Sequence, residues 1–175
     1  MLFAITPFFM TGLILSLIHA IGVVLGVGGA VFAEIFTLRA LRDGVVDPTE
    51  SDFLKTTYRV LRVGMVLLIF SGFGFFLLYR LDGNTEYLYN VKYWVKMTFV
   101  VIILLNALLL QAKRIPFWLG STLSITSWLG ALVVSVIGRA LTNASYLDIM
   151  VLYLLAIPVV ALFLDFIHRS VMKKT

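Results

Sequence analysis

The segment LIHAIGVVLGVGGAVFAEI, residues 17–35, decides the fold class, because it is apolar enough to lie in a lipid bilayer. It carries one ionisable residue near each end, His19 and Glu34. Ionisable groups inside a membrane are costly and are therefore functional candidates. The residues between these two ends include four glycines, Gly22, Gly26, Gly28 and Gly29. The segment predicts a membrane-spanning helix with a close neighbour, a ligand, or both.

The composition of the 175-residue chain is that of an integral membrane protein. Hydrophobic residues make up 61% of it and charged residues 13%, and the mean hydropathy is +1.05. Apolar runs of about 20 residues, the length that crosses a bilayer, recur along the whole chain. We therefore predict an all-α bundle of five transmembrane helices that forms a single domain. The predicted helices lie near residues 8–40, 49–81, 88–112, 116–141 and 146–171.

Several classes of function are disfavoured by the same composition. The chain has no cysteine, which excludes thiolate metal sites, iron–sulfur clusters and disulfides. Its net charge of +5 comes from basic residues at helix ends, where the expected partner is the lipid bilayer with its anionic headgroups rather than nucleic acid. The six methionines show no paired spacing, so a thioether copper site is not favoured.

The predicted connections carry clear start and turn signals. Asp47, Pro48 and Glu50 have the spacing of a helix N-cap, a first-turn proline and a capping box. The segment SYLD, residues 145–148, repeats the device before the fifth helix. The short segments DGNT, residues 82–85, and KRIP, residues 113–116, predict tight turns between antiparallel helices.

The orientation follows from the distribution of Lys and Arg. Ten of the fourteen fall on the side that holds the C-terminus. The positive-inside rule therefore predicts an external N-terminus and a cytoplasmic C-terminus, in a multi-pass protein of the cell membrane. An aromatic belt agrees with this assignment on the external side, formed by Tyr87, Tyr89, Tyr93, Trp94 and Tyr146.

Counting residues from the cytoplasmic boundary places two polar groups at one depth. His19 lies 20 residues before Arg39, or about 30 Å at 1.5 Å per helical residue. Lys96 lies 17 residues before Lys113, or about 25 Å from the same side. Lys96 either extends to the outer headgroups or faces His19. Arg139 is an interface anchor at the right level to meet a propionate or phosphate.

A second polar group lies near the cytoplasmic surface and contains Glu34, Asp165 and His168. We expect charge pairs there, Glu34 with Arg39 and Asp165 with His168 and Arg169. The two histidines are the only ones in the chain and are separated by about 25 Å in depth. A haem ligated by both is therefore excluded, whereas a haem with one histidine ligand, or no haem, remains open.

The small residues of the first helix share a face with His19. Gly22, Gly26 and Ala30 all lie within about 80° of its direction at 100° per residue. They form either a ridge for close helix packing or a slot for a flat macrocycle. His19 is correspondingly a histidine bonded to a neighbouring helix, a residue of the outer interface, or a ligand-binding group.

Two segments resemble a known family. LIHAIGVVLGVGGAVF, residues 17–32, resembles the first helix of the HemJ-type membrane protoporphyrinogen oxidases and the related CopD-like small membrane proteins, where a histidine precedes an apolar run with a glycine pair. YWVKMTFVVIILLNALL, residues 93–109, resembles their third helix, where an aromatic residue precedes a lysine. Glu34 stands where that family favours Pro-Arg, and the family's histidine in the first connection is missing.

The resemblance implies a membrane protein that binds haem b or a porphyrin. His19 would be the axial metal ligand, Gly22 and Gly26 would lie beside the macrocycle, and Lys96, with Arg139, would neutralise a propionate. If the protein is an enzyme, it would remove hydrogens from a porphyrinogen and pass electrons to a membrane acceptor such as quinone.

Two other functions remain open from the sequence. The first is a small permease or ion-handling protein that uses Glu34, Asp165 and His168 as a protonatable gate. The second is a non-catalytic membrane subunit, or a homo-oligomer, whose glycine ridge binds another membrane protein.

Overall fold

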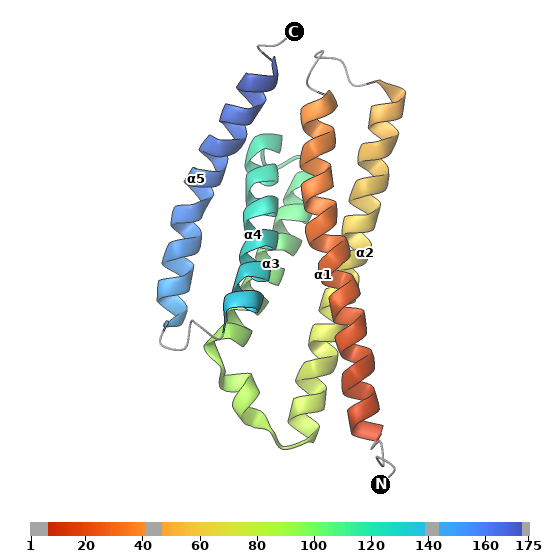
Figure 1. Ribbon diagram of the computed structural model, residues 1–175, viewed down its shortest axis with the longest axis vertical. Helices are drawn as coiled ribbons and strands as arrows, with labels where there is room; N and C mark the ends of the chain where they lie inside the picture. The colour runs from red at the N-terminus through yellow and green to blue at the C-terminus, as the bar shows by residue number, and fades with distance from the viewer. Residues whose placement is uncertain (1–6, 41–46, 139–143, 173–175) are drawn as a thin grey trace.

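The computed structural model describes residues 7–40, 47–138 and 144–172, and within these ranges the chain is helical with no strand. The helices are α1 (Pro7–Ala40), α2 (Pro48–Leu81), the 3₁₀ turn η1 (Thr85–Tyr89), α3 (Val91–Gln111), α4 (Phe117–Ile137) and α5 (Tyr146–Met172) (Figure 1). The five α-helices are long and apolar enough to cross a membrane. The predicted all-α, multi-pass architecture is confirmed, and its orientation in the membrane stays a prediction.

The predicted boundaries agree with the structure to within one or two residues at most helix ends. One difference precedes the third helix, where η1 replaces the predicted start at residue 88 and α3 begins at Val91. Asn90 caps α3 there, since its side chain accepts a hydrogen bond from the Lys92 amide at 3.0 Å. The predicted end of the fourth helix, at residue 141, lies outside the described residues.

Both predicted capping boxes are present. At α2 the Glu50 amide donates to Asp47 Oδ1 at 2.7 Å, and the Asp47 amide donates to Glu50 Oε2 at 3.2 Å. At α5 the Asp148 amide donates to Ser145 Oγ at 3.2 Å, and the Ser145 amide donates to Asp148 Oδ2 at 2.8 Å. Each box satisfies amide groups that the first turn of a helix leaves without partners.

The two predicted turns end their helices with a left-handed residue. Gly83 has φ 72° after α2, a conformation that glycine adopts without strain. After α3 the left-handed residue is Lys113, with φ 53°. The Lys113 amide donates to Leu110 O at 3.0 Å and the Arg114 amide to Leu109 O at 2.9 Å, the paired bonds of a Schellman motif. The helices on either side of each turn run antiparallel, as predicted.

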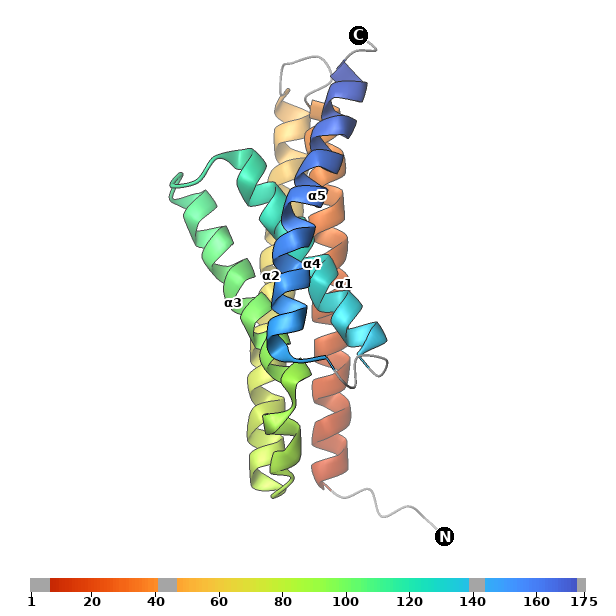
Figure 2. The ribbon, with the colours of Figure 1, turned by 90° about the vertical axis from the view of Figure 1, so that its left-hand side faces the viewer.

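The bundle consists of two antiparallel helix pairs and a fifth helix (Figure 1). α1 packs along α2, α3 packs against α4, and α5 lies against α4 on the side away from α2. α1 and α2 extend past α4 and α5 at the end that holds the N-terminus, and η1 lies at that end as well. Seen from the side, α3 leans away from α2 toward its C-terminal end (Figure 2).

Glycines set the distance between α1 and α2. A Cβ on Gly64 of α2 would lie 2.6 Å from the Gly26 backbone nitrogen and 3.0 Å from the Gly22 carbonyl oxygen. A Cβ on Gly26 would lie 2.1 Å from the indole ring of Trp128, which comes from α4. Protein atoms therefore occupy the space beside Gly22 and Gly26, as the packing interpretation of this ridge requires.

Two clusters of buried side chains form the core. The central cluster joins the first four helices and consists of Ala30, Leu61, Leu68, Ile103 and Trp128. The second joins the last three helices and consists of Val95, Phe99, Val134, Ile149 and Tyr153. The Tyr153 hydroxyl lies 2.8 Å from Ser127 Oγ, so a polar bond ties α5 to α4 inside the second cluster. Along α1, Ala30 of the central cluster lies between His19 and Glu34, so apolar side chains separate these two polar residues.

Candidate functional site

A cavity of about 380 Å³, which we call the His19 cavity, lies between α1, α2, η1 and α3. His19 and Lys96 both line it, from α1 and α3. The depth count had placed these residues in one layer, and the structure gives them one cavity. The remaining wall is mostly aromatic and apolar, and it includes Phe75, Tyr79, Tyr87, Asn90, Lys92, Tyr93 and Met97.

The His19 ring is held by a serine of the neighbouring helix. Nδ1 lies 3.0 Å from Ser71 Oγ, and Ser71 is fully buried. The Ser71 hydroxyl has a single hydrogen, which it donates to the Leu67 carbonyl oxygen at 2.7 Å. When the Ser71 hydroxyl donates to Leu67 O, Nδ1–H of a neutral His19 ring donates to Ser71 Oγ and the lone pair lies on Nε2. No hydrogen bond within the described residues uses Nε2, so this nitrogen is free to bind a ligand.

Lys96 brings a positive charge into the cavity without a negative partner. The ion pairs within the described residues join Lys55 to Asp52, His168 to Glu34 and Arg169 to Asp165. Lys96 takes part in none of them, and no Asp or Glu is among the residues that line its cavity. An ammonium group in an apolar environment without a counter-charge favours an anionic ligand.

The cavity continues sideways between α2 and α3. A second cavity of about 300 Å³ shares Leu68, Gly72, Tyr93, Met97 and Val100 with the first. Its own walls include Ile69 and Phe73, which are exposed on the bundle surface. The residues that the two cavities share come from α2 and from the first half of α3. Together they offer a polar end at His19 and Lys96 and an apolar end toward the lipid, which suits an amphipathic ligand.

Stacked rings form the outer wall of the polar end. Tyr79 of α2 and Tyr87 of η1 stack with ring centroids 4.7 Å apart, and Phe75 stacks on Tyr79 at 6.0 Å. Phe75 also meets the His19 ring edge-on at 5.9 Å. This series of rings connects η1 to the His19 imidazole, and it gives the cavity a flat aromatic surface.

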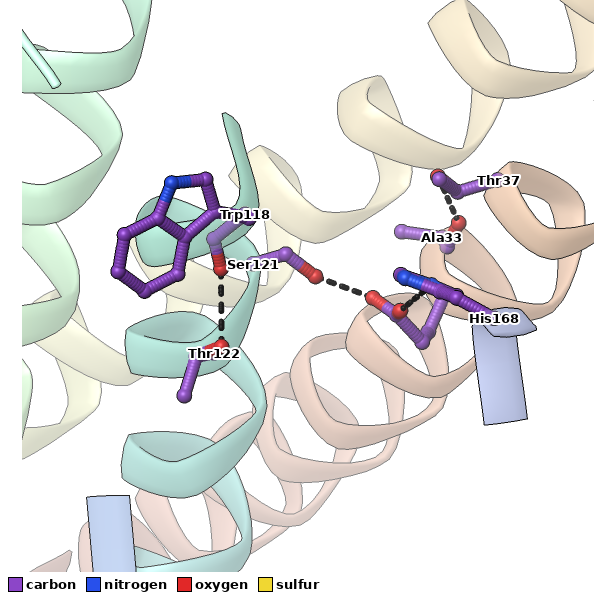
Figure 3. Close-up of polar contacts among 7 residues, drawn as sticks. Ala33, Thr37, Trp118, Ser121, Thr122 and His168 are labelled. Carbon is purple, nitrogen blue, oxygen red and sulfur yellow. Dashed lines mark hydrogen bonds and ion pairs between the residues drawn. The ribbon is translucent and has the colours of Figure 1, made fainter. Parts of the chain in front are cut away.

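A second polar region, the Glu34 cluster, lies toward the C-terminal end of α1 and joins side chains of three helices. Glu34 of α1 is 8% exposed, and its Oε1 lies 3.1 Å from His168 Nε2 of α5. Ser121 of α4 donates a hydrogen bond to Glu34 Oε2. Figure 3 shows Ser121 and His168 approaching from their separate helices. Each carboxylate oxygen therefore has a partner from a different helix.

The predicted charge pairs in this region were partly wrong. Glu34 pairs with His168 and not with Arg39, and His168 does not pair with Asp165. Asp165 instead pairs with Arg169, Oδ2 to Nε at 2.8 Å, on the exposed surface of α5. The prediction favoured residues close in sequence, whereas Glu34 faces the bundle interior and meets a residue 134 positions away. Of the three ionisable residues proposed for a gate, Glu34 and His168 pair with each other and Asp165 pairs with Arg169.

Two threonine hydroxyls near the Glu34 cluster donate to carbonyls of their own helices. Thr37 Oγ1 donates to Ala33 O at 2.8 Å, and Thr122 Oγ1 donates to Trp118 O at 2.8 Å (Figure 3). These threonines do not donate to the carboxylate, which is held instead by Ser121 and His168. The cluster is a compact polar contact between helices.

The two histidines lie in separate regions, as the depth count required. Glu34 follows His19 by 15 residues on one helix, or about 22 Å, and His168 is bonded to Glu34. One iron cannot bind both rings. Arg139, the third proposed site residue, lies outside the described residues. Gly22 and Gly26 pack against α2 and Trp128 and do not line the His19 cavity.

Sequence reasoning missed one residue beside this site. Trp128 of α4 is 1% exposed and lines a small cavity together with His19 and Lys96. Trp128 could not be identified as a cavity residue from the sequence, because a tryptophan in an apolar helix usually packs in the core. Ser71 and Asn106 both make interhelical hydrogen bonds, Ser71 with His19 and Asn106 through Nδ2, which donates to Gly120 O at 2.8 Å.

Comparison with protein-family models, with curated proteins and with solved structures finds no match to this chain. The family resemblance of α1 and α3 therefore stays a prediction. The geometry of the His19 cavity is the basis on which a function can be proposed.

Proposed function

We propose that this membrane protein binds an anionic tetrapyrrole, haem b or a porphyrin, in the His19 cavity. The observation that carries the proposal is the pairing, on one cavity, of a histidine with a free Nε2 and a lysine without a carboxylate partner. An imidazole nitrogen is the common ligand of haem iron, and an ammonium group complements a propionate. The same ligand has a large flat apolar body.

The residues present fit such a group. The contact between Nδ1 and Ser71 Oγ holds the ring from the neighbouring helix and leaves Nε2 without a protein partner, and metal-bound histidines commonly have their other ring nitrogen held in this way. The stacked rings of Phe75, Tyr79 and Tyr87 offer a flat surface. The cavity and its lateral extension, of about 380 and 300 Å³, lie in the range of ligand sites.

Each residue then has a separate role. His19 would bind the metal through Nε2, Ser71 would orient His19, and Lys96 would hold an acidic side group of the macrocycle. The bound group would supply redox chemistry, and the surrounding apolar helices would keep water from it. Oxidation of a porphyrinogen, with a membrane quinone as electron acceptor, is the enzymatic form of this proposal.

An absorption spectrum of the detergent-purified protein, expressed with haem supply and then titrated with haemin, tests the proposal. We expect a Soret band at about one haem per chain, which His19→Ala abolishes or shifts. His168→Gln is the matched control, because it removes the only other histidine while its amide can still donate a hydrogen bond to Glu34, and it should leave the band unchanged. Absence of a Soret band before and after titration, or equal loss in both variants, would contradict the proposal.

Lys96→Met tests the second half of the site. We expect it to weaken haemin binding about tenfold while the Soret position stays that of a histidine-ligated haem, because one charge-assisted bond to a propionate is lost. Lys92→Met provides a comparison, since Lys92 also lines the cavity. If both substitutions weakened haemin binding equally, the cavity would attract the ligand through its overall positive charge and Lys96 would make no specific contact.

A transport function receives less support from the structure. Both oxygens of Glu34 have protein partners, and Asp165 lies on the exposed face of α5. Uptake of protons or cations by proteoliposomes that depends on Glu34 would favour the permease hypothesis over the one proposed here.

A further inference from the structure

A groove of about 460 Å³, which we call the Phe36 groove, runs along α1 and α2. Its lining residues come only from these two helices and are Val24, Leu25, Gly28, Gly29, Phe32, Phe36, Phe53, Thr56, Thr57 and Val60. Several of them are exposed on the bundle surface, among them Val24, Phe32 and Phe53. The groove therefore opens to the surroundings of the bundle, and it shares no lining residue with the His19 cavity.

A glycine and a series of phenylalanines shape the groove. A Cβ on Gly28 would meet no atom within 4 Å, so the space beside this residue is open. At one end Phe36 stacks on Phe53 with ring centroids 5.5 Å apart, and Phe32 stacks on Phe36 at 6.2 Å. The lining residues of α1 extend over the twelve residues from Val24 to Phe36, or about 18 Å. Half of the hydrocarbon core is about 15 Å thick, so the groove has the length of an acyl chain within its leaflet.

A cation lies at the end of the groove where the rings stack. Arg39 follows Phe32 by seven residues, so it lies within about 20° of the same direction on α1 at 100° per residue. Arg39 is exposed, and no ion pair within the described residues includes it. Helical side chains lean toward the N-terminus of their helix, so the Arg39 side chain leaves α1 on the side of Phe36. Apolar length followed by a positive charge complements the acyl chain and the phosphate of a phospholipid.

A second copy of the chain is the other candidate for this face. Two copies inserted in the same direction are related by an axis along the membrane normal, so equivalent residues meet at equal depth. Contact through the Phe36 groove would bring two Arg39 side chains to one level. Glu34, on the same helix, is already bonded to His168 and Ser121 and cannot compensate them. The like charges oppose such a dimer, whereas an anionic headgroup compensates Arg39.

We propose that the Phe36 groove binds one anionic phospholipid, with an acyl chain along Gly28 and Phe32 and the phosphate at Arg39. A guanidinium group can donate to two phosphate oxygens at once, which makes arginine well suited to this contact. The site does not depend on the tetrapyrrole proposal, because the groove and the His19 cavity have different walls.

Native mass spectrometry of the delipidated protein in detergent tests the proposal. The protein is titrated with phosphatidylglycerol or with phosphatidylcholine of identical acyl chains. We expect one phosphatidylglycerol per chain to bind about tenfold more tightly than phosphatidylcholine, because only the anionic lipid compensates Arg39 while both bury the same chain. Equal affinity of the two lipids would overturn the proposal.

Two arginine variants separate the site from general positive charge. Arg39→Gln should lower the affinity for phosphatidylglycerol to that for phosphatidylcholine. Arg62→Gln is the matched control, because Arg62 is also exposed and follows Phe53 by nine residues, which places it on the opposite face of α2. It should leave the affinity unchanged. Equal losses in both variants would assign the lipid preference to overall charge and contradict the site.

Gly28→Leu tests the position of the acyl chain. The new side chain enters open space, so the fold should be retained, which circular dichroism checks. Because the side chain fills the groove, we expect phosphatidylglycerol to bind at least about tenfold more weakly. Unchanged binding, or a dimer that persists after delipidation and that Gly28→Leu dissociates, would overturn the assignment. A missing Soret band would refute the pigment proposal and leave these lipid affinities unaffected.

Discussion

The His19 cavity and the Glu34 cluster each contain one of the two histidines, but they differ in how their charges are satisfied. In the Glu34 cluster the His168 imidazole and the Ser121 hydroxyl each bond to one oxygen of the Glu34 carboxylate, and the three groups come from three helices. At the His19 cavity the imidazole has one partner, Ser71, and Lys96 has no acidic partner among the described residues.

This difference distinguishes polar groups that stabilise helix packing from polar groups that can bind a ligand. A polar cluster that satisfies itself stabilises the packing of its helices and has nothing left to offer a ligand. A cavity that keeps a free nitrogen, an unpaired ammonium and room beside them has binding capacity. The comparison predicts that substitutions at the Glu34 cluster change stability, whereas substitutions at the His19 cavity change binding.

The largest expected effect comes from removing one partner of the buried pair. His168→Leu leaves the Glu34 carboxylate without its imidazole, and we expect the free energy of unfolding to fall by about 3 kcal/mol. Unfolding by SDS in mixed micelles, followed by circular dichroism, measures it. The double variant Glu34→Gln, His168→Leu should recover part of the loss. If His168→Leu lowered the free energy of unfolding less than His19→Leu does, the prediction would be contradicted.

The second largest loss of stability is expected at the contact between α1 and α2, which lies between the His19 cavity and the Glu34 cluster. Gly64→Ala places a methyl group 2.6 Å from the backbone of Gly26, which cannot move aside cheaply, so we expect a loss of about 2 kcal/mol. Gly28→Ala is the control, because no atom lies within 4 Å of its added Cβ. The same unfolding titration compares them, and equal stabilities would mean that α1 and α2 are not packed through these glycines.

A smaller effect is expected where the histidine serves a ligand. His19→Leu removes the bond to Ser71, whose hydroxyl keeps its own bond to Leu67 O, so we expect the pigment-free protein to lose about 1 kcal/mol or less. Measured in the same micelles, a loss as large as that of His168→Leu would show that His19 is chiefly structural.

The smallest effect is expected at the exposed pair of α5. Asp165 and Arg169 are both more than half exposed, and surface pairs of this kind contribute about 0–1 kcal/mol. Asp165→Asn should therefore leave the unfolding midpoint unchanged within error, in low and in high salt. A clear loss would show that α5 depends on this pair as much as on His168.

The helical layout could be predicted from the sequence because its signals are local. Apolar runs of bilayer length, the capping residues Asp47 and Ser145 and the turn residue Gly83 each act within a few residues of the chain. The depth of a residue in the membrane can also be estimated from its own helix, because it follows from the rise per residue. That is why the shared layer of His19 and Lys96 could be inferred before any helix was placed.

The partners of the polar residues could not be predicted in the same way. Whether Glu34 meets Arg39 or His168 depends on which helices are neighbours and on how each is rotated, and five similar apolar helices do not encode this in their hydropathy. Trp128 could not be identified for the same reason, because only the position of α4 against Gly26 shows that its side chain lines a cavity together with Lys96.

For a ligand of the proposed kind, the lateral extension between Ile69, Phe73 and Met97 would decide from which phase it enters. A molecule that arrives by this path comes from the hydrocarbon layer and not from the aqueous solution. Loading would then follow the mole fraction of the molecule in the lipid, so a sparingly water-soluble compound could saturate the protein at a negligible free concentration in the surrounding medium.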